Sequence, residues 1–209
     1  MRVNEFSVDI AKGTETGEGY VSMKHNTKYA LSLGNHGHRR CDALVSIDGK
    51  SIGGFRIGAY ETIEIERPVD DDGCFTFYRA GSKKGDKAGL GSVSKSDMGL
   101  ITVEFRPEKK RKPKRISGAG GQSILRSASL SSYSTPVRDS VELTSRGIDL
   151  KAGGTGLSGK SDQSFYTVED LKFDKKEVVT INLRLVEGKS KSEPRELAPK
   201  SNSIPSPVN

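Results

Sequence analysis

Alternation of apolar and polar residues with a period of two is the feature that most constrains this chain. The clearest case is VVTINLRLV, which sets Val179, Ile181, Leu183 and Leu185 against Thr180, Asn182 and Arg184, and CDALVSI likewise sets Cys41, Ala43, Val45 and Ile47 on one side. Successive residues of a strand point to opposite faces, so the pattern is typical of a strand with one buried face. Further segments alternate in the same way: FSVDI, YVSM, YALSL, ETIEIER, CFTFY and LITVEF.

Turn signals separate these segments. Asp48-Gly49 directly follows CDALVSI and predicts a tight hairpin, because both residues tolerate a positive φ. Gly53-Gly54 lies inside the returning strand and predicts a bulge or sharp bend. The stretch PVDDDG, residues 68–73, predicts a surface turn. Together these signals indicate strands that follow one another through short connections.

The predicted fold class is all-β. No segment has a convincing helical period of 3.6, and only short helical turns around residues 83–91 or 167–173 are expected. Many short strands at regular spacing favour two packed antiparallel sheets, whereas an open meander would leave its edges exposed. We expect an antiparallel β-sandwich, single jelly-roll-like, with a long basic and serine-rich loop and a flexible C-terminal tail.

Composition divides the chain into four parts. Residues 1–106 are expected to form the main part of the sandwich. Residues 107–140 begin with PEKKRKPKR and continue rich in serine and glycine, so this excursion cannot bury enough apolar surface to fold alone. Residues 141–187 return to the sandwich with its final strand. Residues 188–209 are polar, contain proline and are expected to form a flexible tail.

The excursion carries the sharpest local charge signal. The whole chain has a formal net charge of +7, which favours anionic partners such as nucleic acid, membrane headgroups or acidic protein surfaces. The alternative is a solvated basic loop without a dedicated partner. No aromatic residue interleaves with the run, so stacking on bases is not indicated. The candidate partner-binding or polyanion-binding residues are Lys109, Lys110, Arg111, Lys112, Lys114 and Arg115.

The stretch HGHRRCD raises the question of a metal or catalytic site. It brings His36, His38, Cys41 and Asp42 close together in sequence. Zinc requires further ligands, usually from a second cluster with matching spacing, and the chain has no CxxC and no HExxH. It also has no GxSxG elbow for a nucleophile. The interpretation we favour is a loop that leads into a strand, so no catalytic residue, metal ligand or cofactor is assigned.

Three smaller features were also considered. The run Asp70 to Asp72 could attract calcium but lacks the spacing of an EF-hand loop, so a solvated turn is expected. Cys41 and Cys74 are the only cysteines and are expected to be buried thiols, although a disulfide between them stays open. No signal peptide and no run of about 18 apolar residues is found, which favours synthesis in the cytosol.

A set of longer segments carries a resemblance. They are YVSMKHNTKYALSLGN, RCDALVSIDGKSIGGFRI, IERPVDDDGCFTFYRAGS, DMGLITVEF, GLSGKSDQSF and VVTINLRLV, within residues 20–106 and 153–187. Together they resemble a structural protein type of large icosahedral DNA viruses of algae, the chlorella-virus group. The resemblance implies a non-enzymatic virion protein made in the host cytoplasm and located in the capsid. It implies either a vertex (penton) subunit or a minor capsid protein that acts as cement, and it leaves this choice open.

The resemblance also implies the partners. These are the major capsid protein, neighbouring minor proteins and further copies of the chain, with the basic loop free to contact an inner membrane surface or nucleic acid. No small-molecule substrate is implied. The alternative is a β-sandwich binding module for nucleic acid or another polyanion through residues 109–115. A carbohydrate module would depend on tyrosines alone, since tryptophan is absent: Tyr60, Tyr78, Tyr133 and Tyr166. An enzyme acting through the HGHRRCD stretch is the remaining alternative.

Overall fold

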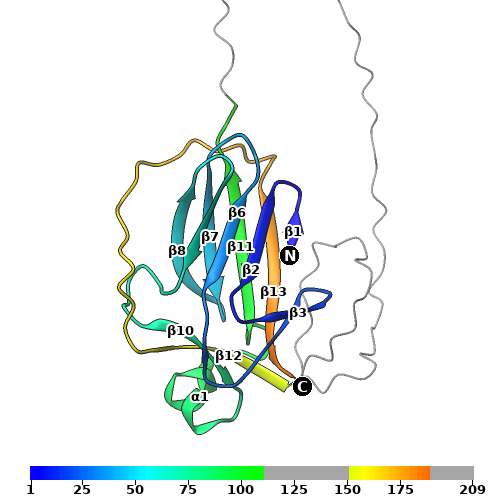
Figure 1. The fold of residues 1–209 in the computed structure, drawn as a ribbon, viewed down its shortest axis with the longest axis vertical. Coiled ribbons are helices and arrows are strands. Elements are labelled where there is room, and N and C mark those ends of the chain that lie inside the picture. Colours follow the sequence, from blue (N-terminus) through cyan, green and yellow to red (C-terminus); the bar gives the residue numbers. More distant parts are fainter. Residues whose placement is uncertain (111–150, 189–209) are drawn as a thin grey trace, which may run out of the picture. The chain divides into compact units, whose positions relative to one another are not determined.

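The computed structural model describes residues 1–110 and 151–188, and these residues form an antiparallel β-sandwich. The first layer is a four-stranded sheet (Figure 1). Its strands run in the order β1 (Arg2–Val3), β2 (Phe6–Ile10), β6 (Leu31–Asn35) and β9 (Glu61–Ile65). The predicted all-β sandwich is therefore confirmed, while a jelly-roll topology stays a prediction.

The second layer is a nine-stranded sheet. Its main path runs in the order β5 (Thr27–Lys28), β10 (Cys74–Arg79), β12 (Lys151–Ser158), β13 (Val179–Glu187), β11 (Leu100–Pro107), β7 (Cys41–Ile47) and β8 (Lys50–Ile57). β4 (Tyr20–Met23) pairs in parallel with β13, and β3 (Thr14–Gly17) pairs with β4. The last strand of the described chain is thus placed in the middle of the sheet, next to β11.

The core lies between the layers and is built from alternate strand positions. β7 and β11 bury every second residue, as their sequence patterns predict. The rings of Phe6 from the first sheet and Phe105 from the second stack with centroids 4.6 Å apart. An offset aromatic pair of this kind adds to the stability gained from burying its surface. The two layers are therefore joined by direct side-chain packing.

The predicted hairpin is confirmed in detail. Asp48 and Gly49 connect β7 to β8 with φ values of 52° and 75°, as a two-residue hairpin turn of the primed type requires. The pairing register then shifts between Val45 and Ser46, opposite the predicted bulge, where Gly53 has a φ of 140°. Local turn chemistry is thus sufficient to predict this part of the fold.

Helix predictions are confirmed at one place and wrong at the other. α1 (Lys83–Lys87) and the 3-10 turn η1 (Leu90–Ser92) lie where a helical turn was expected. Residues 167–173 form no helix, because they belong to an extended segment whose Phe173 forms an isolated bridge with Glu108, the residue after β11. Within the described residues, no helix is long and apolar enough to cross a membrane.

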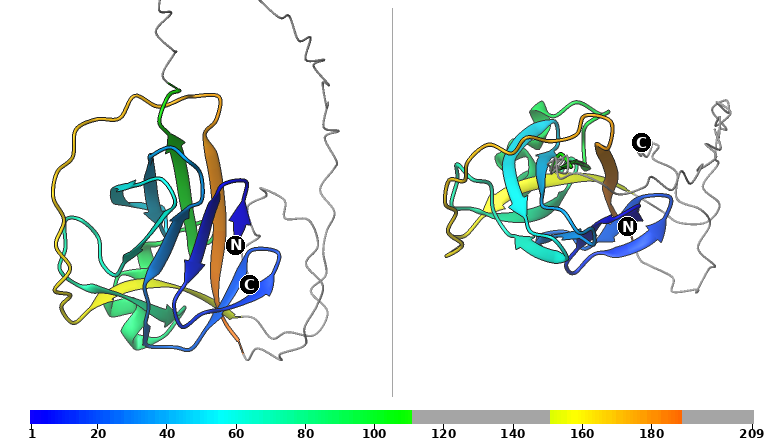
Figure 2. Two further views of the ribbon diagram at one scale, coloured as in Figure 1. Left: turned by 45° about the horizontal axis from the view of Figure 1, so that its top comes forward. Right: turned by 90° about the horizontal axis from the view of Figure 1, so that it is seen from above.

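This extended segment, residues 159–172, is called the strap below. Figure 2 shows it leaving β12, running along one flank of the sandwich and reaching β13. The side-chain amide of Gln163 donates to Glu64 O at 2.7 Å and accepts from Glu66 N at 3.0 Å. The Gln163 side chain thereby satisfies backbone groups along β9, the outer edge strand of the first sheet. Arg56 of β8 donates to Glu169 O at 2.8 Å, so the strap also contacts the edge strand of the second sheet. Covering an edge in this way protects it from pairing with another chain.

Candidate functional site

Four loops meet at one end of the sandwich, and together they are called the loop end: residues 36–40, 58–60, 108–110 and 172–177. They meet because antiparallel neighbours run in opposite directions. β6, β8 and β11 finish at this end, while β7, β9 and β13 start from it. The loop end therefore contains both the HGHRRCD stretch and the first residues of the basic run.

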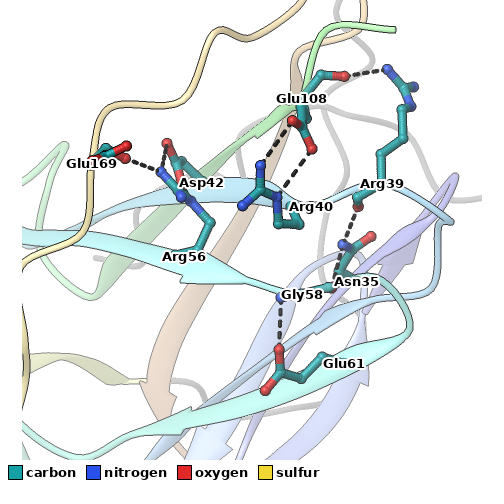
Figure 3. Close-up of polar contacts among 9 residues, drawn as sticks. All are labelled: Asn35, Arg39, Arg40, Asp42, Arg56, Gly58, Glu61, Glu108 and Glu169. Carbon is teal, nitrogen blue, oxygen red and sulfur yellow. Dashed lines mark hydrogen bonds and ion pairs between the residues drawn. The ribbon is translucent and has the colours of Figure 1, made fainter. Parts of the chain in front are cut away.

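Asn35 fixes the course of the first loop. Its buried side chain donates to Arg39 O and to Gly58 O, both at 2.7 Å, and accepts from Gly37 N at 3.0 Å. The Glu61 carboxylate accepts from Gly58 N at 2.7 Å (Figure 3). A buried amide that satisfies three backbone groups in this way makes the loop rigid. The loop that suggested a chemical centre is thus a structural connection between β6 and β7.

Two arginines tie this loop to the end of β11. Arg40 donates to both carboxylate oxygens of Glu108, at 2.9 and 3.1 Å. Arg39 donates to Glu108 O at 2.7 Å and forms an ion pair with Glu177. Arg39 Nε is buried and has no hydrogen-bond partner within residues 1–110 and 151–188. The root of the basic excursion is therefore held on the folded body by charge-assisted hydrogen bonds.

A second arginine–carboxylate pair holds the strap. Arg56 of β8 binds both oxygens of Asp42 on β7 and also donates to the backbone oxygen of Glu169 (Figure 3). Asp42 belongs to the HGHRRCD stretch and lies on the face of β7 opposite Cys41. Its observed contacts give it a structural role across the β7–β8 pair.

The chemical groups of HGHRRCD do not converge on one point. His36 and His38 are exposed, and His36 Nε2 lies 3.0 Å from Ser7 Oγ on the outer face of the first sheet. Cys41 faces the core, and its burial raises the pKa of the thiol to about 12. Within the described ranges, no group of three histidine, cysteine, aspartate or glutamate residues is arranged to hold a metal ion.

The remaining cysteine, histidine and acidic features also have structural surroundings. Cys41 and Cys74 are buried free thiols, which confirms that prediction over the disulfide. His25 Nδ1 accepts from Arg79 N at 3.0 Å. In the acidic run, Asp71 accepts from Gly73 N at 2.7 Å and Asp72 lies 3.6 Å from Arg67. The acidic run is thus a turn held by its own side chain and by an arginine.

Only part of the predicted basic cluster can be placed. Lys109 and Lys110 are exposed at the loop end, while Arg111, Lys112, Lys114 and Arg115 lie outside the described residues. Lys109 N donates to Lys172 O at 2.8 Å, next to the bridge between Glu108 and Phe173. The fold therefore brings a second lysine-bearing segment, residues 172–176, against the first.

The tyrosines considered for a carbohydrate-binding platform differ in their exposure to solvent. Tyr78 is buried, and Tyr133 lies outside the described residues. Tyr60 is 73% exposed at the loop end, and Tyr166 is 87% exposed on the strap. Tyr78 is therefore ruled out as part of a binding platform in this structure.

Sequence reasoning missed the burial of Asp48 and Arg184, two charged side chains that contact distant segments. Asp48 accepts from Gly99 N and Thr155 N, both at 2.6 Å, and burial raises its pKa to about 6. Arg184 donates to Met98 O at 2.7 Å and to Ser96 O at 2.8 Å, and burial lowers its pKa. Arg184 occupies a position of β13 that was predicted to face solvent. The burial of Asp48 and of Arg184 could not be predicted from local sequence patterns, because the backbone groups that these side chains contact are far away in sequence.

Comparison of the chain with protein-family models, with curated proteins and with solved structures finds no match.

Proposed function

We propose that this chain is a non-enzymatic structural protein of a virion capsid, a vertex subunit that works by binding copies of itself. The sequence resemblance supplies the class of protein. The observation that carries the assembly role is a group of exposed apolar side chains on one flank, called the strap flank. Its members are Val69, Leu157, Tyr166 and Val168, which are 47%, 39%, 87% and 40% exposed.

The segments that carry the strap flank are bonded to one another. Val69 N donates to Ile52 O of β8 at 3.0 Å, and Ser161 N of the strap donates to Asp72 O at 2.8 Å. Leu157 packs closely against the backbone at Gly73. Of the five large apolar side chains that are most exposed in the described part of the chain, only Tyr60 lies elsewhere. Clustered exposed apolar surface is typical of protein–protein contact sites.

The covered sheet edges support the same role. The Gln163 side chain occupies backbone hydrogen-bonding positions beside β9, at Glu64 O and Glu66 N, so uncontrolled strand addition is disfavoured there. Contacts between copies would then be made by side chains of the strap flank. A vertex ring needs a heterologous interface that closes on itself, and defined side-chain contacts provide such geometry.

Analytical ultracentrifugation of a paired set of variants tests this proposal. Tyr166→Ser with Val168→Ser should weaken association at least thirtyfold, because truncation of an interface aromatic residue typically costs about 2 kcal/mol. The conservative pair Tyr166→Phe with Val168→Ile should retain association. Equal association of both variants would contradict a role for the strap flank. If the unchanged protein is itself monomeric, the result would favour a cement protein that binds only to the assembled shell.

A further inference from the structure

Four lysines at the loop end find no partner for their ammonium groups among the residues that the structure describes. Lys109, Lys172, Lys175 and Lys176 are exposed, and none of their side chains forms an ion pair or hydrogen bond within residues 1–110 and 151–188. Two carboxylates adjacent in sequence to these lysines pair with arginines: Glu108 with Arg40 and Glu177 with Arg39. Asp174 uses its carboxylate to accept from Lys176 N at 3.1 Å.

Two of these lysines stand opposite one another. The bridge between Glu108 and Phe173 is antiparallel, and Lys109 N donates to Lys172 O at 2.8 Å beside it. Like charges directly across a pair of strands repel and destabilise the pairing. The pairing is held elsewhere, by Asp174 N donating to Pro107 O at 3.0 Å and by Arg106 stacked over the Phe173 ring at 5.0 Å. A bound anion between the lysines would remove the repulsion.

An exposed aromatic ring lies at the same end. Tyr60 N donates to Gly37 O at 3.1 Å, which places Tyr60 beside the loop that contains His38. Its φ of 59° is a left-handed conformation that glycine adopts without steric cost and tyrosine does not. Tyr60 is 73% exposed, so burial of its side chain does not offset this cost. Strained backbone with an exposed side chain is a frequent feature of ligand-binding sites.

We propose that the loop end binds single-stranded nucleic acid, with phosphates on Lys109, Lys172, Lys175 and Lys176 and a base stacked on Tyr60. Phosphate contacts by lysine and stacking on an aromatic ring together are typical of sequence-tolerant single-strand binding. A membrane surface fits less well, because the other strongly exposed apolar side chains of the described residues lie on the strap flank. This inference goes beyond the proposed assembly role and does not depend on it.

The test uses the full-length chain and a fluorescently labelled 20-nucleotide oligothymidylate, with binding followed by anisotropy between 50 and 200 mM salt. The variant Lys172→Gln, Lys175→Gln, Lys176→Gln should bind about a hundredfold more weakly at 100 mM salt. Its plot of log affinity against log salt should be shallower by about two units, because three phosphate contacts are lost. The variant Tyr60→Gly should lose about five- to a hundredfold in affinity, since it removes the ring. It also relieves the backbone strain, so it should fold at least as well.

A matched control is available on α1, which lies at the other end of the sandwich (Figure 1). Lys83, Lys84 and Lys87 are exposed there, and replacing all three by glutamine removes the same charge. This control should bind the oligonucleotide within about threefold of the unchanged protein. Equal losses in the two triple variants would overturn the proposal, because they would indicate a net-charge effect. So would an unchanged affinity of Tyr60→Gly, or binding to phosphatidylserine vesicles without binding to the oligonucleotide.

Discussion

Stability should depend on the protonation of one buried carboxyl group, that of Asp48. Asp48 is 7% exposed and joins the β7–β8 turn to two other segments, through Gly99 N and Thr155 N. Burial is the main cause that raises its pKa from 3.8 to about 6, while the two backbone hydrogen bonds act in the opposite direction. Between about pH 4 and pH 6, therefore, the Asp48 carboxyl group is protonated more often in the folded state than in the unfolded state.

The sign and size follow from proton linkage. Where the folded state binds more protons, the free energy of unfolding falls as pH rises. With pKa values of about 6 folded and 3.8 unfolded, Asp48 adds about 2 kcal/mol at pH 4.5 and almost nothing at pH 7.5. The variant Asp48→Asn removes this titration, although its amide places one N–H group against a backbone donor and so lowers stability at every pH.

Urea unfolding followed by circular dichroism, at pH 4.5 and pH 7.5, measures the effect. The difference in unfolding free energy between the unchanged protein and Asp48→Asn should be about 2 kcal/mol larger at pH 4.5. Taking this difference cancels the titration of carboxylates common to both proteins. A difference that is independent of pH, or larger at pH 7.5, would refute the inference that Asp48 is destabilised in its charged form.

Two further predictions concern packing and a buried cation. Gly153→Ala should destabilise the fold by about 1–3 kcal/mol, because a Cβ there would lie 2.3 Å from the buried Phe77 ring. Thermal unfolding measures this, and Gly91→Ala, where the added Cβ would meet only Asp86 Oδ1 at 4.0 Å, should change stability by less than about 0.5 kcal/mol. Arg184→Leu should cost about 3 kcal/mol and speed tryptic cleavage after Lys95, because Met98 O and Ser96 O lose their donor. Cleavage at an unchanged rate would show that Arg184 does not hold this loop.

The sequence predicts well those features whose conformation depends only on residues close together in the chain. The β7–β8 hairpin depends on Asp48 and Gly49, whose conformations are set locally, and its register shifts on β8 directly before Gly53, one of the two predicted glycines. The alternating sequences of β7 and β11 likewise predict one buried face, and in the structure the other face of each strand is half-buried. The same alternation misleads in β13, where both faces are buried. There Asn182 accepts from Thr102 of β11, and Arg184 is covered by the loop before β11.

The features that the sequence could not predict depend on contacts between distant residues. Gln163 and Glu64 are 99 residues apart, so nothing local indicates that residues 159–172 form a strap rather than a helical turn. Tyr60 is brought beside the 36–40 loop through the bond from Tyr60 N to Gly37 O, a contact between residues 23 positions apart that no local pattern indicates. Arg111 to Arg115, most of the basic cluster, lie outside the described residues and stay predictions.

The assembly role is tested most directly by the solution mass of the unchanged protein, from light scattering after size exclusion at low and high salt. The chain has a mass of 22.6 kDa, so a pentameric ring should scatter as about five times that mass. A discrete oligomer that persists in high salt is predicted, because the strap flank is apolar. A monomer of 22.6 kDa at all concentrations and both salts would contradict self-assembly through the strap flank.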